Sequence, residues 1–455
     1  MRGARRRGHH QSNAAVCGRT LWAHSVVAEE MAALAALREA VAPVINAAGA
    51  NTLHSGSRMR PEAFDAVEAV HGQFYNLLEL LDAAGEAIVG LVDPAGQHPN
   101  LEAAAVCAGA ATGMAIMAAA ALTCGDASPA RRAALPRTDG FASELVVQRS
   151  HSINYDQSWE ITGGSLVFAG AAAGCTAVEL EACVHPGRTA ALLFLAEKPA
   201  TLTLPEVVAV ARKHSLPVLV DAASVLPSKT RLTQYLDEGA AMVCFKGGGA
   251  IRGPQSTGLV LGQRQLIAEA RANGFPNQSI MRAAKVCKEE IFGLVAAVEG
   301  FMADDEPALL AGQTADMQRL ATTLATAVPG VATRVVAVHP SSQEATPFCV
   351  IKLEGPRWSG AASAEAIAEQ LCQVGPEPVY TQTYLPLLTD VVVWNAPACQ
   401  APREGEPRIF MSRLLLEADE LAVIAQMLQP GEAETIGAVL LRCLGEHAST
   451  PVSRL

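Results

Sequence analysis

The order of apolar and polar residues from about residue 144 onward predicts alternating strands and helices. Several apolar runs have strand length, and some are apolar throughout, as strands covered on both faces are; they span residues 144–151, 165–170, 189–197, 216–224, 240–245 and 256–262. Helix-like segments lie between them, one over 204–214 that opens with Pro205 and Glu206, and one over 228–238 with Ser228 as a possible cap. This alternation predicts a mostly parallel sheet, whose ligands bind beyond the carboxyl ends of its strands.

The pattern changes after Glu299 to longer amphipathic helices with fewer strands. The candidate strands there are RVVAVHP (334–340), FCVIKLEG (348–355) and DVVVWNA (390–396). A chain of 455 residues exceeds what one hydrophobic core usually supports. We therefore expect a basic, unstructured leader, a large α/β domain and a smaller C-terminal α+β domain, over residues 1–40, 41–299 and 300–455.

Composition narrows the classes of function. The formal net charge of -11 provides no overall basic field for nucleic acid or acidic membranes, and it suits a small polar substrate. Eleven cysteines without a C-x-x-C pair argue against a disulfide framework and a zinc site, and they favour a cytoplasmic location. The arginine-rich start offers organelle targeting as an alternative. Residues 103–125 are uncharged but mostly alanine, so they predict a buried helix rather than a membrane span.

Two charged residues stand at the ends of predicted strands. Asp221 ends LPVLVD, so its carboxylate is held at the sheet edge and needs a cationic partner, such as a protonated pyridine nitrogen. The alternative is a carboxylate that caps the following turn. Lys246 follows the strand AAMVCF and precedes three glycines, a position that suits a Schiff-base lysine, and equally a surface lysine at the mouth of a loop.

Two further segments carry candidate binding groups. Gly109, Ala110, Ala111 and Thr112 join a strand to a long helix, and small residues at a helix N-terminus favour a phosphate, although an ordinary tight turn has the same pattern. His151 lies just past another strand end, where its ring could stack on a flat ligand or serve structure alone. Asp156 either orients this histidine or caps the next helix. Together with Asp221 and Lys246, these groups indicate pyridoxal phosphate in an aspartate-aminotransferase-like fold.

Several segments also carry a family resemblance. From about residue 41 onward, the chain resembles the branch of pyridoxal-phosphate enzymes of fold type I that contains selenocysteine synthase (L-seryl-tRNA selenium transferase) and D-glucosaminate-6-phosphate ammonia-lyase. The segments that carry it are INAAGANTLHSGSRMRP (45–61), GAATGMA (109–115), VVQRSHSINYD (146–156), LVDAAS (219–224), AIRGPQSTGLVLG (250–262) and MRAAKVCKEEIFGLVAAVE (281–299).

The resemblance implies roles for individual residues and a homodimer or larger homo-oligomer. Residues 109–112 would hold the cofactor phosphate with Lys285 nearby, His151 would stack on the ring, and Asp221 would meet its nitrogen. Ser224, Arg252 and Gln255 would line the site.

The family pattern departs at the Schiff-base lysine, because the position expected to hold it is Gly249 and the nearby lysine is Lys246. Three interpretations follow. Lys246 has taken over the role, the chain binds the cofactor without a covalent link, or the chain is a catalytically silent homologue.

The favoured function is a lyase that removes the α-proton of a small amino acid and eliminates a group from its β-carbon, as an ammonia-lyase does. A substrate carboxylate calls for an arginine fork, for which the candidates are Arg408 and Arg413, with Arg58, Arg252 and His54 as further substrate-binding residues. Selenium transfer to seryl-tRNA is disfavoured, because the chain is acidic and lacks a basic amino-terminal domain for a large tRNA surface.

Overall fold

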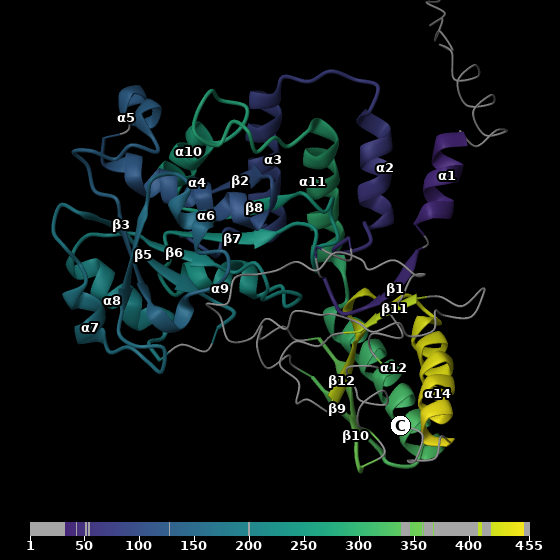
Figure 1. The fold of residues 1–455 in the computed structure, drawn as a ribbon. Coiled ribbons are helices and arrows are strands. Elements are labelled where there is room, and N and C mark those ends of the chain that lie inside the picture. The colour runs from purple at the N-terminus through teal and green to yellow at the C-terminus, as the bar shows by residue number, and fades with distance from the viewer. Residues whose placement is uncertain are drawn as a thin grey trace, which may run out of the picture. The chain divides into compact units, whose positions relative to one another are not determined.

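The computed structural model has two compact units, Met1–Val44 and Ile45–Leu455. It describes residues 32–41, 43–50, 52, 55–126, 128–198, 201–337, 346–356, 358, 367, 408–411 and 420–449. In the first unit, part of the leader expected to be unstructured forms helix α1 (Ala32–Ala40). The second unit carries the large sheet and the candidate site (Figure 1).

A mixed sheet in the order β2-β8-β7-β6-β5-β3-β4 forms the centre of this unit. Its strands are β2 (Ala103–Cys107), β3 (Glu144–Gln148), β4 (Ser165–Ala169), β5 (Thr189–Leu195), β6 (Val218–Asp221), β7 (Met242–Lys246) and β8 (Gly258–Gly262). Only β8 runs against its neighbours, since β2 and β7 both pair with it in antiparallel register and the remaining pairs are parallel. The predicted mostly parallel sheet is confirmed.

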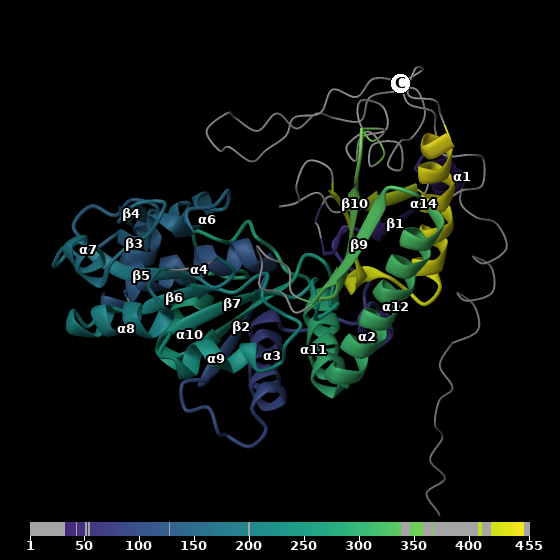
Figure 2. The ribbon, with the colours of Figure 1, turned by 90° about the horizontal axis from the view of Figure 1, so that it is seen from below.

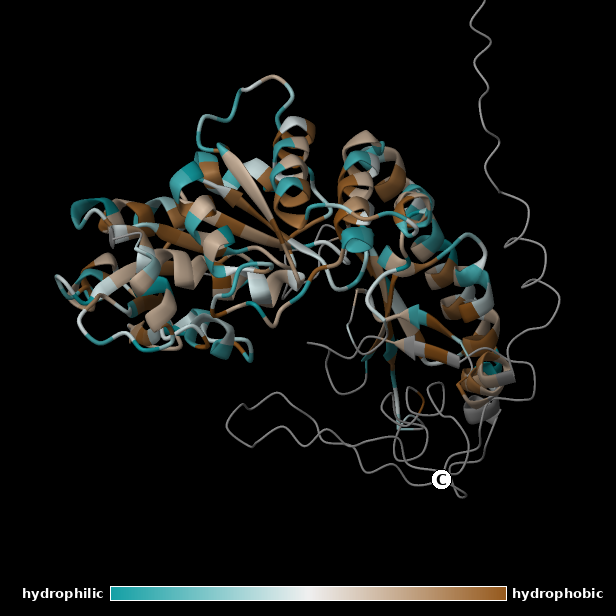
Figure 3. Ribbon diagram, turned by 90° about the horizontal axis from the view of Figure 1, so that it is seen from above, coloured by the Kyte–Doolittle hydropathy of each residue, from teal (hydrophilic) through white to brown (hydrophobic). Residues whose placement is uncertain are grey.

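Helices cover both faces of the sheet, so its strands are buried on both sides and mostly apolar (Figure 3). One face packs against α3 (Leu77–Val92), α7 (Ala177–Ala182), α8 (Leu204–Lys213), α9 (Arg231–Asp237) and α11 (Lys288–Ala303). The other packs against α4 (Gly109–Thr123), α6 (Gln157–Glu160) and α10 (Arg264–Asn273). Helix α2 (Pro61–Val70) lies along α11, and α5 (Pro129–Ala134) lies beside α4.

Local sequence signals explain some of the helix starts. Thr203 and Glu206 form a capping box at the start of α8, where Pro205 occupies the first turn as predicted. The predicted cap of the next helix is wrong, because α9 begins at Arg231 with Thr230 in the N-cap position, and Ser228 lies in the preceding turn. The uncharged run 103–125 holds strand β2 and the buried helix α4. Among the described residues, no helix has the length and apolarity that a membrane crossing requires.

A second hydrophobic core lies among smaller sheets (Figure 2). Strand β10 (Phe348–Leu353) pairs with β9 (Val331–Val336) and β12 (Glu420–Ile424), while β1 (Val44–Ala47) pairs with β11 (Arg408–Met411). Helices α12 (Glu306–Ala327) and α14 (Glu432–Ser449) cover this core. The first two predicted strands of this region are present in part, whereas 390–396 lies outside the described residues. Because Ile45 packs in this core, β1 contributes to it although it precedes the large sheet in the chain.

Candidate active site

The carboxyl ends of the parallel strands bring the predicted residues to one edge of the sheet. Asp221 ends β6 and Lys246 ends β7, next to each other in the sheet. His151 lies in the short 3-10 turn after β3, and Gly109 follows β2 after one residue. Strand β8 links β2 to β7, because its Gly258 pairs with Cys107 of β2 on one side and with Lys246 of β7 on the other.

The alternation of side chains along the strands decides on which face the charged groups lie. Met242 and Cys244 of β7 and Leu219 of β6 pack in the core beneath α4 and α10. Lys246 and Asp221 are in phase with these residues, so both side chains belong to the face on which α4 lies. The N-terminus of α4 begins at the same edge, at Gly109. The site is therefore bounded by the sheet edge and the first turn of α4.

Asp221 is a buried acid with few compensating contacts. Only 4% of the residue is exposed, and its Oδ1 accepts a hydrogen bond from the backbone N–H of Ala223 at 3.0 Å. The Cys244 thiol lies 3.8 Å from the same oxygen. Burial raises the pKa of Asp221 to about 7, the Glu197 charge adds to this, and the Lys246 charge acts in the opposite direction. A cation placed against this carboxylate would relieve the cost of burying it.

His151 is buried beside Asp221, and both line one small pocket together with Trp159. The His151 Nδ1 accepts a hydrogen bond from the backbone N–H of Leu195 at 3.1 Å, which fixes the ring, while its buried Nε2 has no partner. The Phe194 ring packs edge-on against the His151 ring, with 4.9 Å between the two ring centroids. Burial lowers the pKa of His151 to about 4, with a smaller contribution from the Lys198 charge, so the ring is neutral at pH 7.

Asp156 plays neither of its two predicted parts. Its carboxylate accepts hydrogen bonds from the Ser152 hydroxyl at 2.6 Å and from the backbone N–H of Ile153 at 3.1 Å. It makes no hydrogen bond to His151 and no side-chain cap on α6. Asp156 therefore shapes the turn that follows His151.

The first turn of α4 has the features of an anion site. Gly109 has a φ of +79°, which favours glycine, and the first turn contains no acid. Ala111 is exposed, and Gly109, Ala110 and Thr112 are partly exposed. Gly258 allows β8 to approach this turn, since a Cβ there would lie 2.6 Å from the Gly109 carbonyl carbon.

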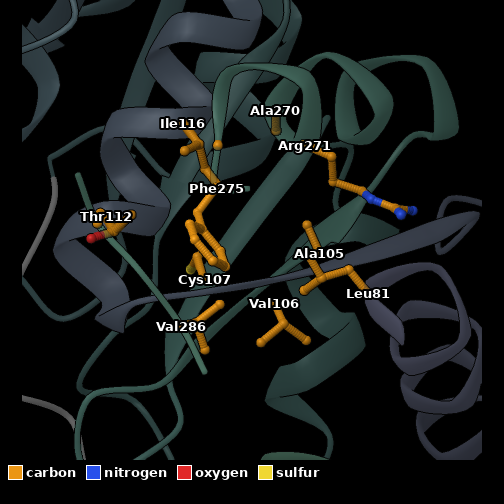
Figure 4. Close-up of a pocket in the computed structure, with 12 residues that line it drawn as sticks. Leu81, Ala105, Val106, Cys107, Thr112, Ile116, Ala270, Arg271, Phe275 and Val286 are labelled. Carbon is orange, nitrogen blue, oxygen red and sulfur yellow. The ribbon is translucent and has the colours of Figure 1, made fainter. Parts of the chain in front are cut away.

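A pocket behind this turn connects it to the segment that carries Lys285. Thr112, Phe275, Ala284 and Val286 line it with other mostly apolar residues (Figure 4). Lys285 lies between Ala284 and Val286 in the chain and is exposed. The pocket itself lacks charged groups apart from Arg271, so the chemistry belongs to the Asp221 and His151 pocket rather than to this one.

Lys246 and its loop occupy the space between these features. The Lys246 ammonium is 3.5 Å from the hydroxyl of Ser224, which lies in the loop after Asp221. The following residues 247–253, which we call the glycine loop, are largely buried. Gln255 packs against this loop at Gly248 and against Gly56 of the N-terminal loop. The predicted residues Ser224, Lys246 and Gln255 thus lie around one loop.

The N-terminal loop, residues 55–60, is fastened to the glycine loop. The Ser57 hydroxyl donates to the Gly248 carbonyl, and the backbone N–H of Arg60 donates to the Arg252 carbonyl at 2.8 Å. The Arg60 side chain donates to the Ile251 carbonyl at 2.8 Å and forms an ion pair with Asp304. Only 6% of Arg60 is exposed, so this fastening is part of the interior.

The predicted arginine fork cannot be followed in the described residues, which include the backbone of Arg408 but not Arg413. Arg58 forms an ion pair with Glu432 of α14 at 2.6 Å, and Arg252 donates from Nε to the Arg58 carbonyl at 3.0 Å. Arg408 begins β11, in the smaller sheets. His54 and Arg413 lie outside the described residues. The structure therefore brings Arg58 and Arg252 together at the N-terminal loop.

Sequence reasoning missed a charged pair at the end of β5. Glu197 and Lys198 follow Leu195, and their charges act on the pKa of Asp221 and of His151 respectively. The rule applied to Asp221 and Lys246, a charge directly after an apolar strand, would have found them in TAALLFLAEK. Phe194 was also missed, since a strand residue gives no sign of what its side chain contacts.

The described residues fit pyridoxal phosphate. A protonated pyridine nitrogen would provide the cation that the buried Asp221 lacks, and the unpartnered Nε2 of His151 offers a second polar contact to a bound group. The open first turn of α4, which contains no acid, suits a phosphate.

Comparison with known proteins identifies the family. No protein-family model matches the chain. The D-glucosaminate-6-phosphate ammonia lyase of Salmonella typhimurium (strain 14028s / SGSC 2262) is 32% identical over 266 residues, which cover 57% of this chain and 67% of that protein. The chain belongs to the D-glucosaminate-6-phosphate ammonia-lyase family. The 5'-C-glycyluridine monooxygenase-decarboxylase of a Streptomyces species is 27% identical over 421 residues, covering 90% of this chain and 92% of that protein.

Solved structures agree with this assignment. A structure of D-glucosaminate-6-phosphate ammonia-lyase superposes with a TM-score of 0.70 at 25% identity, covering 91% of this chain and 98% of that one. A complex of SepCysS with the N-terminal domain of SepCysE superposes with a TM-score of 0.52 at 11% identity, covering 90% and 96%. The predicted family, the fold-type-I architecture and the assignment as an enzyme are thereby confirmed.

Proposed function

We propose that the protein is a pyridoxal-phosphate-dependent ammonia-lyase for a small amino acid that carries a leaving group on its β-carbon. The observation that carries this proposal is the pocket in which a buried carboxylate, Asp221, and a neutral histidine with an unpartnered nitrogen, His151, lie together in a member of this family. A catalytically silent homologue would have no need to keep so costly a buried acid.

The chain's residues would divide the work as follows. When bound, pyridoxal phosphate supplies an electron sink for the charge left by removal of the α-proton. Asp221 would hold the positive charge on the ring nitrogen, and His151 would contact the ring. Gly109 to Thr112 and Lys285 would hold the phosphate. A lysine amine, from Lys246, would take the α-proton and return it during product formation.

The overall reaction would convert a β-hydroxy amino acid into an α-keto acid and ammonia. The amino group leaves as ammonia, the β-hydroxyl leaves as water with a proton drawn from the site, and one water supplies the keto oxygen, while the proton taken from the α-carbon is returned at the β-carbon. The atoms balance without an oxidant. Arg252 and Arg58, which the N-terminal loop brings together, are the described candidates for the substrate carboxylate.

The test is the release of keto acid and ammonia from a panel of β-hydroxy and β-phospho amino acids by the purified protein with added pyridoxal phosphate. We expect a ratio of 1:1 and a loss of at least about 100-fold in Asp221→Asn, since the charge partner of the ring is removed. Cofactor-loaded protein that releases neither product from any member of the panel would contradict the proposal.

One observation favours a second function, oxidative decarboxylation at the α-carbon. The Streptomyces monooxygenase-decarboxylase aligns with 90% of this chain, although at lower identity than the ammonia lyase. Such a reaction would consume O₂ and release CO₂, neither of which elimination involves. Oxygen uptake with a glycyl-type amino acid, in place of ammonia release, would favour this function. The homo-oligomeric state and the cytoplasmic location are part of the proposal and are tested by sedimentation and by imaging of a tagged chain.

A further inference from the structure

The side chain of Lys246 occupies the space in front of Gly249. A Cβ added to Gly249 would lie 2.4 Å from Cε of Lys246 and 3.0 Å from both its Cδ and its Cγ. Carbon atoms in protein interiors do not approach so closely, because packing is dense but without overlap. The lysine arm therefore folds back across the glycine three residues later, and any side chain at position 249 would displace it.

Glycine is required at position 249 for space and not for backbone conformation. The φ of Gly249 lies outside the left-handed region, in contrast to that of Gly109 at +79°. An alanine could therefore adopt this backbone without strain. The atoms that it would meet belong to the flexible arm of Lys246, so the arm would move and the fold would remain.

The folded-back arm delivers its amine to the site. The Lys246 ammonium is 3.5 Å from the Ser224 hydroxyl, in the loop that follows Asp221. Lys246 also pairs with Gly258, which packs against the first turn of α4 at Gly109. The amine is thus held between the strand end that carries the buried acid and the first turn of α4.

We infer that Lys246 is the residue that links covalently to pyridoxal phosphate, and that Gly249 is its structural complement, leaving room for the arm. This inference rests on the proposed function, because it presupposes the cofactor. The Lys246 nitrogen would bond to the aldehyde carbon, and the aldehyde oxygen would leave as water with the two amine protons. Lys246 and Gly249 then form one unit, in which the lysine that carries the cofactor can stand at position 246 or 249 as long as the other position is glycine.

The experiment detects this link as an added mass on a peptide and does not depend on catalytic activity. Protein is loaded with pyridoxal phosphate, freed of excess cofactor by gel filtration, reduced with borohydride and digested. We expect one cofactor-derived mass on the peptide that contains Lys246. Labelling should disappear in Lys246→Arg, which keeps the charge but cannot form the link, while non-covalent binding, measured by quenching of protein fluorescence, persists.

Two glycine variants test whether Gly249 leaves the room that the Lys246 side chain needs. Gly249→Ala should retain the wild-type melting temperature but lower the trapped yield at least about tenfold, because the arm is displaced. Gly253→Ala is the matched control, since a Cβ there would meet the Gly247 carbonyl oxygen at 3.2 Å and not Lys246; its yield should stay unchanged. The exchange variant Lys246→Gly with Gly249→Lys should recover labelling, now at position 249.

The outcomes separate this inference from the proposed function. Labelling at Lys198 or Lys285, an unchanged yield in Gly249→Ala, or tight cofactor binding that depends on Asp221 without any trapping would overturn the inference and leave the proposed function standing. Failure of the wild-type protein to bind pyridoxal phosphate at all would overturn both.

Discussion

The buried pair Asp221 and His151 makes a quantitative prediction about stability without cofactor. Burial raises the pKa of Asp221 from 3.8 to about 7, so ionising this carboxyl in the folded state costs about 4 kcal/mol. Between these pH values the folded chain retains a proton that the unfolded chain has released. Through Asp221 alone, the free energy of unfolding therefore falls by about 4 kcal/mol as the pH rises from 4 to 7.

His151 acts in the opposite direction over nearly the same range. Its pKa falls from 6.5 to about 4 on folding, so between these values the unfolded chain binds a proton that the folded chain excludes. Through His151 alone, the free energy of unfolding rises by about 3 kcal/mol between pH 4 and 6.5. The two contributions largely cancel in the wild-type protein, and only single variants reveal them.

Asp221→Asn and His151→Asn are suitable variants, because each keeps the acceptor for its backbone N–H donor, Ala223 or Leu195. Relative to wild type, Asp221→Asn should leave the free energy of unfolding nearly unchanged at pH 4 and raise it by up to about 4 kcal/mol at pH 8. His151→Asn should raise the free energy of unfolding by up to about 3 kcal/mol at pH 4, and above pH 7 it should bring no charge-related increase.

The assay is urea unfolding of the cofactor-free protein, followed by circular dichroism at steps of half a pH unit from pH 4 to 8. A constant m-value across variants and pH serves as the check on two-state behaviour. Asp65→Asn, an exposed residue of α2, changes the net charge equally and controls for general charge effects. A difference between Asp221→Asn and wild type that stays constant from pH 4 to 7 would refute the reasoning. A gain in stability with a loss of cofactor binding is the expected mark of a site residue.

Two further predictions concern the proposed phosphate site, the first turn of α4 with Lys285. Lys285→Ala should weaken binding of pyridoxal phosphate at least severalfold while leaving binding of pyridoxal and the melting temperature unchanged, because this exposed cation would serve only the phosphate; equal loss for both ligands would contradict this role. Gly258→Ala should destabilise the protein by about 1–3 kcal/mol in urea unfolding, because its Cβ would meet the Gly109 carbonyl carbon at 2.6 Å, and wild-type stability would show that the turn can yield.

The sequence predicted the large sheet well because its signals are local. Strands buried on both faces read as continuous apolar runs, and a charge at the end of such a run must lie at the sheet edge. Asp221, Lys246 and His151 were found in this way, and the structure places them at one edge. The smaller sheets were predicted less completely, since ELAVI (420–424) is too short a run to distinguish a strand from a helix.

What the sequence could not provide were contacts between distant segments. The pairing of β1 with β11 and the fold of the Lys246 arm over Gly249 depend on tertiary packing, which no local pattern records. The same limit explains the arginines. Arg58 and Arg252 were named from separate segments, and the structure adds two contacts that no local pattern records, from Arg252 Nε to the Arg58 carbonyl and from Arg58 to Glu432.

The fastening of the N-terminal loop to the glycine loop also has a consequence for biosynthesis. Arg60 and its acceptor Ile251 are separated by 191 residues, so the loop is synthesised long before its partner leaves the ribosome. Until then, the Arg60 guanidinium lacks this partner and Asp304. The glycine loop that follows Lys246 can therefore be fastened completely to the N-terminal loop only after residue 304 has been synthesised, when all strands of the large sheet already exist.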